Sequence, residues 1–165
     1  MKILVLGLGN LLMNDDAAGL EIIYRLQKQY DLNKYPFLHF MDGGTLGLDI
    51  VPHLSDVTHL IIVDAVDLDL KPGTVVKIEG DDIHAVFESK LSPHQMGLKD
   101  ILTAAELVDM KPEYVVMYGI QIKDINMDQQ FSKEVLDGLN KLEEAVKSEI
   151  EGLISKLKDG NHKVP

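Results

Sequence analysis

Residues 2–26 read KILVLGLGNLLMNDDAAGLEIIYRL and decide the fold. The apolar run over residues 2–8 is short and rich in Ile, Leu and Val, which predicts a buried strand that ends at Gly7 and Gly9. From residue 15 to residue 30, apolar side chains recur at helical spacing, and acidic residues stand at the start, as the helix dipole favours. A buried strand, a tight glycine turn and a helix form the first unit of an α/β domain.

The rest of the chain continues this alternation of strands and helices. The sequence predicts further strands over residues 36–41, 59–65, 73–80 and 114–122, and further helices over residues 46–54, 92–108 and 131–157. The strand at 73–80 is short and alternating, which is typical of a sheet edge. We therefore expect an α/β fold: a three-layer sandwich with a mostly parallel five-stranded sheet, one antiparallel edge strand and helices on both faces.

Two of the predicted helices have strong local signals. The helix at 92–108 starts with Ser92 as the N-cap, Pro93 at the first helical position and Gln95 three residues after the serine. The helix at 131–157 has one apolar stripe, formed by Val135, Leu139, Leu142, Val146, Ile150 and Leu153. Both helices are therefore expected to pack against the sheet along one side.

The length and composition predict one globular domain. The 165 residues are expected to form a single domain over residues 1–165 with a frayed tail at 159–165. No apolar run approaches the roughly 20 residues of a membrane span. The first apolar run lacks the basic flank and the small-residue cleavage site of a signal peptide, so we expect a cytoplasmic protein.

Charge and cysteine usage exclude several classes of function. The chain has 27 acidic and 16 basic residues, which gives a net charge of -11. Such a field repels nucleic acid and anionic membranes, so we expect neither as a partner. The chain has no cysteine, which excludes disulfides, thiolate metal ligands and a cysteine nucleophile. A metal site in this protein must use oxygen or imidazole ligands.

Polar residues follow the predicted strands at the points where ligands bind in open α/β sheets, beyond the carboxyl ends of the strands. They are Asn10, Asp15 and Asp16 after the first strand, Asp42, Gly43 and Gly44 after the second, Asp64 and Asp67 after the third, and His94 after the fourth. We expect these groups to converge at one edge of the sheet. Two or three carboxylates and one imidazole form a plausible site for a divalent cation that keeps open positions for water or substrate.

Each of these residues also has a structural interpretation. Asp16 could cap a helix, His94 could be an exposed residue of a first helical turn, and the segment DGGTLG at residues 42–47 could be a simple turn. Asp64 is harder to explain in this way, because a carboxylate that ends a buried apolar strand must be paired, hydrogen-bonded or bound to a cation. The positive end of a helix would keep the His94 imidazole neutral, as a metal ligand requires.

Two other fold families share parts of this pattern. A dinucleotide-binding turn would need glycine at position 12, which is Leu12, and the carboxylates at the helix start would repel a pyrophosphate. A receiver domain of two-component signalling also has an acidic pair after its first strand, an aspartate like Asp64, and a lysine near its last strand, here Lys123. Receiver domains have no need of the GLGN turn or of His94, so this alternative is the weaker one.

Four segments together closely resemble the maturation endopeptidases of nickel-iron hydrogenases. They are GLGNLLMNDDAAG at residues 7–19, DGGTLG at 42–47, HLIIVDA at 59–65 and SPHQMGL at 92–98. Their order and spacing match over nearly the whole chain, which makes the combined signal far stronger than any one motif. One departure is visible, because many members of the family have glycine directly after the acidic pair and this chain has Ala17.

The resemblance implies a cytoplasmic, monomeric endopeptidase of the aspartic type that removes a C-terminal extension from the precursor of a hydrogenase large subunit. It implies that nickel is borne by the substrate and bound transiently, with no permanent organic cofactor. By this resemblance Asp16, Asp64 and His94 are the metal-binding and catalytic residues. Asp42, with Gly43 and Gly44, is implied to contact the precursor.

The residues are compatible with more than one mechanism. The metal ion could polarise the scissile carbonyl or activate a water molecule. Alternatively, Asp16 or Asp64 could act as a general base once the metal has docked the substrate. The sequence leaves this choice open, together with the identity of the hydrogenase and of the bond that is cleaved.

Overall fold

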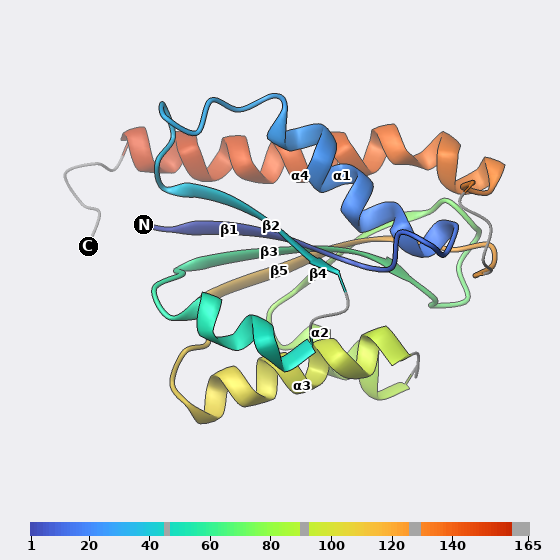
Figure 1. Cartoon of the computed structure of the whole chain (residues 1–165), viewed down its shortest axis with the longest axis horizontal. Helices are drawn as coiled ribbons and strands as arrows, with labels where there is room; N and C mark the ends of the chain where they lie inside the picture. The colour runs from blue at the N-terminus through green and yellow to red at the C-terminus, as the bar shows by residue number, and fades with distance from the viewer. Residues whose placement is uncertain (45–46, 90–92, 126–129, 160–165) are drawn as a thin grey trace.

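The computed structural model describes residues 1–44, 47–89, 93–125 and 130–159 of the chain, and for residues 86–89 and 93–97 it describes the backbone alone (Figure 1). The predicted N-cap at Ser92 and the tail at 160–165 lie outside the described residues. Within them, a five-stranded sheet lies between two layers of helices, which confirms the expected three-layer α/β sandwich.

The sheet is mixed, with one antiparallel strand at its edge. Its strands are β1 (Ile3–Leu8), β2 (Leu38–Gly44), β3 (His59–Val66), β4 (Val75–Glu79) and β5 (Tyr114–Gln121). Their order is β2-β1-β3-β5-β4, and the neighbouring pairs among β2, β1, β3 and β5 are parallel. β4 runs antiparallel to β5, as predicted for the short edge strand.

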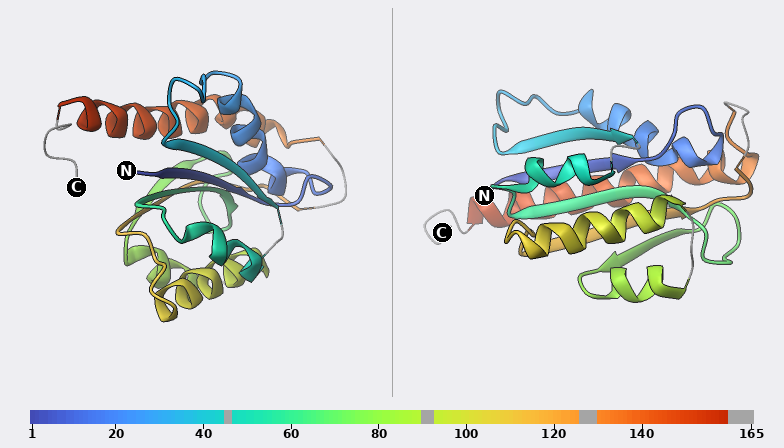
Figure 2. Two further views of the ribbon diagram at one scale, coloured as in Figure 1. Left: turned by 60° about the vertical axis from the view of Figure 1, so that its left-hand side comes forward. Right: turned by 60° about the horizontal axis from the view of Figure 1, so that its bottom comes forward.

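The helices divide between the two faces of the sheet. They are the 3-10 helix η1 (Asp15–Ala17), α1 (Ala18–Gln27), the 3-10 helix η2 (Gly47–Leu54), α2 (Asp82–Ser89), α3 (Pro93–Leu107) and α4 (Lys133–Asp159). α1 and α4 cover one face, and η2, α2 and α3 cover the other (Figures 1 and 2). Among the described helices, none combines the length and the apolar character needed to cross a membrane.

Because both faces of the sheet are covered, the central strands are apolar on both sides. In β3, Ile61 and Val63 pack into the cluster under α1 and α4, whereas Leu60 and Ile62 pack into the cluster under η2 and α3. This alternation follows from the two-residue period of a strand. The predicted apolar stripe of α4 is confirmed, since all six of its residues are buried: Val135, Leu139, Leu142, Val146, Ile150 and Leu153.

Several predicted boundaries were wrong. The helix expected over residues 15–30 is a 3-10 turn followed by α1, which ends at Gln27. The strand expected over residues 59–65 continues to Val66, because β5 keeps pairing with β3 through these last residues. The strand expected over 36–41 starts at Leu38 and continues through the glycine pair, since β1 supplies hydrogen-bonding partners there.

Helix α2 was not predicted from the sequence. It has only eight residues and lies between β4 and the segment that leads into α3. A helix this short gains little from its own hydrogen bonds and depends on tertiary packing. Its buried residue Ile83 joins the cluster that contains Ile78 of β4 and Ile101 of α3, which supplies that packing.

The first turn of α1 lies unusually close to the sheet, and Gly19 makes this possible. A Cβ atom at this position would lie 2.3 Å from the carbonyl oxygen of Val63 and 2.8 Å from that of Leu8. Only a residue without a side chain fits between the helix and the ends of β1 and β3. The start of α1 is therefore fixed directly beside the residue that precedes Asp64.

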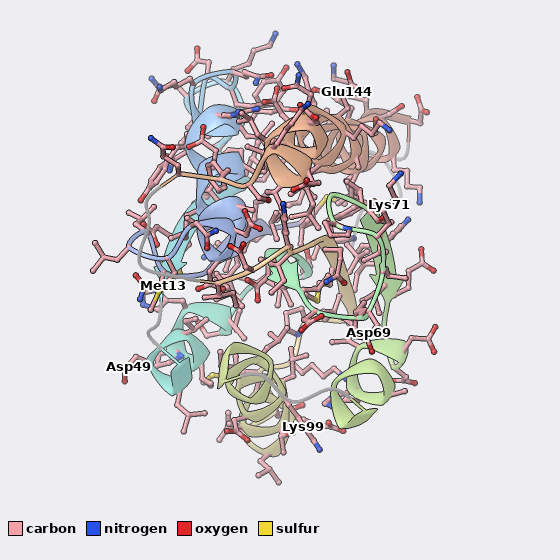
Figure 3. All side chains as sticks on the ribbon, turned by 90° about the vertical axis from the view of Figure 1, so that its right-hand side faces the viewer. Met13, Asp49, Asp69, Lys71, Lys99 and Glu144 are labelled. Atoms are coloured by element: carbon pink, nitrogen blue, oxygen red, sulfur yellow. The ribbon has the colours of Figure 1, made fainter. Side chains whose placement is uncertain are left out.

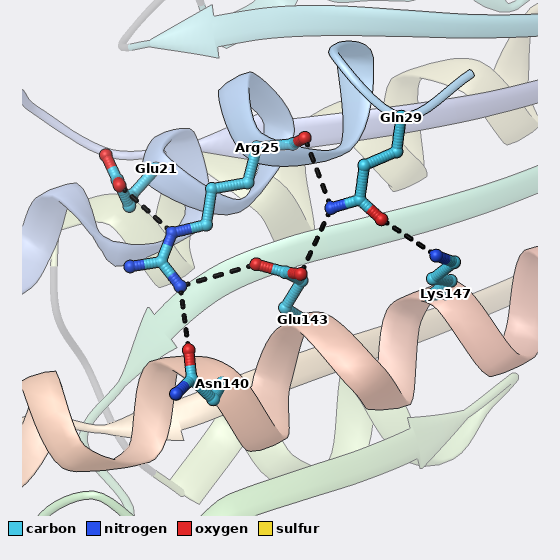
Figure 4. Close-up of polar contacts among 6 residues, drawn as sticks. All are labelled: Glu21, Arg25, Gln29, Asn140, Glu143 and Lys147. Atoms are coloured by element: carbon cyan, nitrogen blue, oxygen red, sulfur yellow. Dashed lines mark hydrogen bonds and ion pairs between the residues drawn. The ribbon is translucent and has the colours of Figure 1, made fainter.

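α1 and α4 are also joined by a polar network on their exposed sides (Figure 4). Arg25 of α1 binds Glu21 of the same helix at 3.1 Å and Glu143 of α4 at 3.3 Å. Gln29 donates to Glu143 and accepts from Lys147. These contacts fix the relative rotation of two helices that frame one side of the sheet.

Candidate active site at the carboxyl end of the sheet

The strand order places the candidate site between β1 and β3. From β1 the chain moves outward to β2, and it then returns to the other side of β1 to form β3. Such a reversal opens a crevice beyond the carboxyl ends of the two strands, where α/β proteins bind their ligands. Figure 3 looks onto this edge, with Met13 of the β1–α1 loop and Asp69 of the β3–β4 loop labelled.

Asp64 is the most unusual residue at this edge. It is fully buried, and its position in β3 directs its side chain to the face covered by η2 and α3, as for Ile62 and Val66. Its Oδ1 atom accepts a hydrogen bond of 2.8 Å from the backbone N–H of Ala65. Its Oδ2 atom is buried and has no hydrogen-bond partner among the described residues. A buried carboxylate oxygen in this state is costly unless a ligand satisfies it.

Asp16 lies close enough to Asp64 to affect its ionisation. Burial raises the pKa of Asp64 well above its ordinary value of 3.8, the negative charge of Asp16 raises it further, and the Ala65 N–H group lowers it by less. Asp16 is itself buried, with an exposed fraction of 3%. The structure therefore brings together two of the three ligands that the resemblance implies.

The β1–α1 loop is folded around Asp16. The Oδ2 atom of Asp16 accepts a hydrogen bond of 3.1 Å from the backbone N–H of Asn10. The side chain of Asn10 accepts in turn from the backbone N–H of Leu12 at 2.9 Å. Gly9 has a φ of 136°, and a Cβ atom there would lie 2.1 Å from the carbonyl oxygen of Asp16. The glycine of the GLGN turn is therefore needed to bring the loop back over the aspartate.

Asp15 has a full set of protein partners. It is completely buried and accepts hydrogen bonds from the backbone N–H groups of Lys123, Asp124 and Ser132 at 2.9, 3.4 and 2.8 Å. The hydroxyl of Ser132 adds a fourth bond of 2.8 Å. Asp15 is thus a structural residue that ties the β1–α1 loop to the β5–α4 loop at the same edge of the sheet.

The glycine pair and its aspartate lie on the other side of β1. Asp42 is exposed near the end of β2, and its carboxylate accepts a hydrogen bond from the hydroxyl of Tyr24, which raises the pKa of Tyr24. Gly43 is buried in the strand. Asp42 and Gly44 line a shallow hollow of about 200 Å³ together with Asn10 and Leu11. These positions are suited to contact an extended ligand that reaches the Asp16 loop.

Asp67 has a structural partner. Its Oδ1 atom accepts a hydrogen bond of 3.1 Å from Gln121, a buried residue that the sequence analysis missed. The carbonyl oxygen of the Gln121 side chain also accepts from the backbone N–H groups of Leu68 and Leu70. Gln121 therefore holds the β3–β4 loop in place. Its role could have been inferred from the sequence, because it is a polar residue in an otherwise apolar strand.

The backbone of His94 lies at the second residue of α3. The carboxyl end of α3 leads into the amino end of β5, so the amino end of α3 lies at the carboxyl edge of the sheet. This is the edge at which the sequence predicted His94. The side chain of His94 lies outside the described part of the structure, so its role as third ligand stays a prediction. Among the described side chains, no group of three His, Cys, Asp or Glu residues is arranged to hold a metal.

The donor set that is described suits a divalent cation with open coordination positions. A cation beside Asp64 would satisfy its unbonded oxygen and offset the repulsion from Asp16. Two carboxylates leave room for further ligands from another molecule. The geometry does not suit a receiver domain, since the amino group of Lys123 contacts Glu134 at 3.4 Å rather than Asp64.

Comparisons with known proteins identify the family. Residues 20–149 match the family model described as hydrogenase maturation protease. The chain is 38% identical over 121 residues to the hydrogenase 2 maturation protease of Escherichia coli K12, covering 73% of each chain. It is 35% identical over 125 residues to the hydrogenase expression/formation protein HupD of Rhizobium leguminosarum bv. viciae, covering 75% of this chain and 61%, less than two thirds, of that relative.

Solved structures agree with this result. The hydrogenase maturating endopeptidase HybD from E. coli superposes with a TM-score of 0.82 at 30% identity, over 92% of this chain and 93% of that chain. The nickel-iron hydrogenase maturation protease HybD from Thermococcus kodakarensis gives a TM-score of 0.77 at 31% identity, over 90% of this chain and 98% of that chain. The chain belongs to the hydrogenase maturation protease family.

Proposed function

We propose that this protein is an endopeptidase that removes the C-terminal extension from the nickel-loaded precursor of a nickel-iron hydrogenase large subunit. The nickel ion belongs to the substrate and is bound transiently by Asp16, Asp64 and His94. The protein acts as a cytoplasmic monomer, and it uses no permanent organic cofactor. Family membership supports the protease activity and the kind of substrate.

The observation that supports this proposal most strongly is the unsatisfied Oδ2 atom of Asp64 beside a second buried carboxylate. Burying the Asp64 carboxyl group away from water costs free energy, and the described part of the protein supplies no hydrogen bond to its Oδ2 atom that would offset this cost. Such a cost is typical of residues that are held ready for a ligand. A metal ion carried by another protein is a ligand that both carboxylates can bind at once.

The residues then divide into two groups. Asp16, Asp64 and His94 recognise the nickel ion, so that an unloaded precursor makes fewer contacts and is not processed. Asp42, Gly43 and Gly44 bind the polypeptide next to the cleavage site, and the hollow lined by Asp42 and Gly44 supports this assignment. This division explains how one small enzyme can test metal insertion and position a peptide bond at the same edge of its sheet.

The bound nickel ion can supply electrophilic catalysis by polarising the scissile carbonyl or lowering the pKa of a water molecule. Asp64 and Asp16 orient the ion and hold it away from bulk solvent. Alternatively, Asp16 or Asp64 acts as a general base that accepts a proton from an attacking water once the metal has docked the substrate. Both routes require the two carboxylates in the same positions.

The test is a cleavage assay on a purified large-subunit precursor, prepared with and without nickel and followed by the shift in electrophoretic mobility. We expect processing of the nickel-loaded precursor alone. Asp16→Asn and His94→Ala should remain folded, as judged by thermal unfolding, and lose activity by about two orders of magnitude or more. Undiminished cleavage by these variants would contradict the ligand assignment, and equal cleavage of the nickel-free precursor would contradict nickel recognition.

A further inference from the structure

Exposed apolar side chains gather around the carboxyl edge of the sheet. Among the described residues, those that belong to this edge by their place in the fold are Leu11, Leu12, Leu48, Leu70, Ile125 and Leu136. The other large exposed apolar residues are Leu32, Leu107 and Val108, which lie toward the opposite end of the sheet. Exposed apolar side chains near a candidate active site are typical of a surface that binds another protein.

One hollow in this region, of about 450 Å³, lies beside the β1–α1 loop that contains Asp16. It is lined by Leu11, Leu12, Ala17, Glu21 and Phe131, and we call it the leucine hollow. Its two leucines are about half exposed, at 50% and 54%. A volume of this size is sufficient for one or two side chains of an extended peptide.

Two residues connect the leucine hollow to the neighbourhood of the candidate site. Ala17 follows the buried ligand Asp16 directly in the 3-10 turn η1. Leu11 also lines the smaller hollow that contains Asp42 and Gly44. A peptide that passes over Leu11 would therefore contact both hollows.

The charge around the leucine hollow favours a basic partner. Glu21 is the charged residue that lines it, and the Glu21 carboxylate is bound by Arg25, which is shared with Glu143 of α4. Lys147 lies in the same network through Gln29, so its two carboxylates are matched by two cations, and the negative field at the hollow is that of the whole chain. The chain as a whole has a net charge of -11, so a second copy would be repelled and a segment containing Lys or Arg would be attracted.

We propose that the leucine hollow docks an extended segment of the hydrogenase large-subunit precursor in which an apolar side chain is adjacent to a Lys or Arg. The apolar side chain packs between Leu12 and Phe131, and the basic residue faces Glu21. Docking there sets the distance between the scissile bond and the Asp16–Asp64 pair. This inference rests on the proposed function, because it identifies the surface that holds the same substrate.

The experiment compares Leu12→Ser with Leu107→Ser, a matched control in which an exposed leucine is replaced at the far end of the molecule. Both variants should unfold at the wild-type temperature. For Leu12→Ser we expect KM for the nickel-loaded precursor to rise about tenfold, with kcat within about twofold of wild type, because the hollow contributes to binding rather than to chemistry. Leu107→Ser should leave both constants unchanged.

A second pair of variants tests the charge. Glu21→Lys should raise KM by more than Glu21→Gln, and the difference should shrink as the salt concentration rises. Binding of the precursor is measured separately by titration calorimetry. Leu12-dependent binding without any cleavage by the wild type would support the docking surface while contradicting the proposed protease function.

Four results would overturn the docking proposal. They are an unchanged KM and binding affinity in Leu12→Ser, an equal loss in Leu107→Ser, a failure of the wild type to bind the precursor at all, and a wild-type dimer that dissociates on Leu12→Ser substitution. The last result would assign the leucine hollow to a second copy of this chain.

Discussion

Asp15 and Asp16 are adjacent in the sequence and both are buried, yet their surroundings differ in kind. Asp15 accepts four hydrogen bonds from two segments of the β5–α4 loop. Asp16 is held by the N–H group of Asn10 and lies near the unsatisfied carboxylate of Asp64. Asp15 stabilises the fold. Asp16 and Asp64 form a buried pair of carboxyl groups whose burial and mutual repulsion lower the free energy of unfolding.

We therefore predict that Asp15→Ala lowers the free energy of unfolding by about 3 kcal/mol, since it leaves several buried N–H groups without an acceptor. Asp15→Asn should cost less, because an amide keeps one acceptor oxygen. Ser132→Ala removes one of the four bonds and should cost about 1 kcal/mol. Urea denaturation of the three variants measures these values, and a Ser132→Ala loss as large as that of Asp15→Ala would refute the assignment.

At the residue scale, sequence could predict Asp64 and could not predict the role of Asp15. Asp64 stands out because a carboxylate inside an apolar strand conflicts with its surroundings, and this conflict is local. The partners of Asp15 are more than 100 positions away, at Lys123, Asp124 and Ser132, as the sequence separations of 108, 109 and 117 show. No short-range pattern connects an acid to backbone donors at that distance.

At the scale of elements, the position of α1 depends on how closely it approaches the sheet. Gly19 permits the contact with the ends of β1 and β3, and α1 in turn follows directly on the 3-10 turn that contains Asp16. A shift of α1 away from the sheet would therefore change the distance between the two carboxylates. The geometry of the site is thus controlled by a residue that does not belong to it.

Replacing two helical glycines tests this argument. Gly19→Ala should destabilise the protein by about 3 kcal/mol, because the new Cβ atom would collide with backbone carbonyl groups that cannot move aside. Gly152→Ala in α4 should stabilise it by about 0.5–1 kcal/mol, since a Cβ atom there meets no atom within 4 Å and alanine favours the helix. Thermal unfolding of both variants would show the contrast, and similar changes in the two would contradict it.

The elements that sequence predicted well are those with long periodic patterns. The strand pattern of β3 and the apolar stripe of α4 are buried on the predicted sides. The helix expected over residues 15–30 was wrong at its start because hydrogen bonds to the β5–α4 loop hold Asp15 in a tighter turn. α2 was missed because eight residues give too few repeats for a periodic signal.

At the scale of the whole molecule, Glu149 joins three elements. It lies in α4 and accepts hydrogen bonds from the hydroxyls of Tyr114 and Tyr118 in β5 at 3.0 and 2.7 Å. Lys77 of β4 approaches it at 3.3 Å. Burial acts to raise the pKa of Glu149, but the two hydroxyls and the lysine outweigh it, so the pKa lies below the ordinary value of 4.5.

This shift predicts how stability depends on pH. Because the pKa of Glu149 is lower in the folded than in the unfolded protein, its contribution is complete above about pH 4.5 and is lost as the pH falls through the folded value. Glu149→Gln should be less stable than wild type by about 2 kcal/mol at pH 7. The difference should shrink below about pH 4. Denaturant titrations from pH 7 to pH 3 would test this, and a difference that stays constant would contradict it.

The strand order has a consequence for the order of events during synthesis. The first three strands can pair as soon as residue 66 has been made, and this alone brings Asp16 and Asp64 to neighbouring strand ends. β4 emerges next, but its partner β5 begins only at Tyr114 and must insert between β3 and β4. Until then the open edge of β3 is exposed to other chains. The ends of β1 and β3 can therefore meet before the sheet is closed, and the later β5–α4 loop then fixes the turn that contains Asp16.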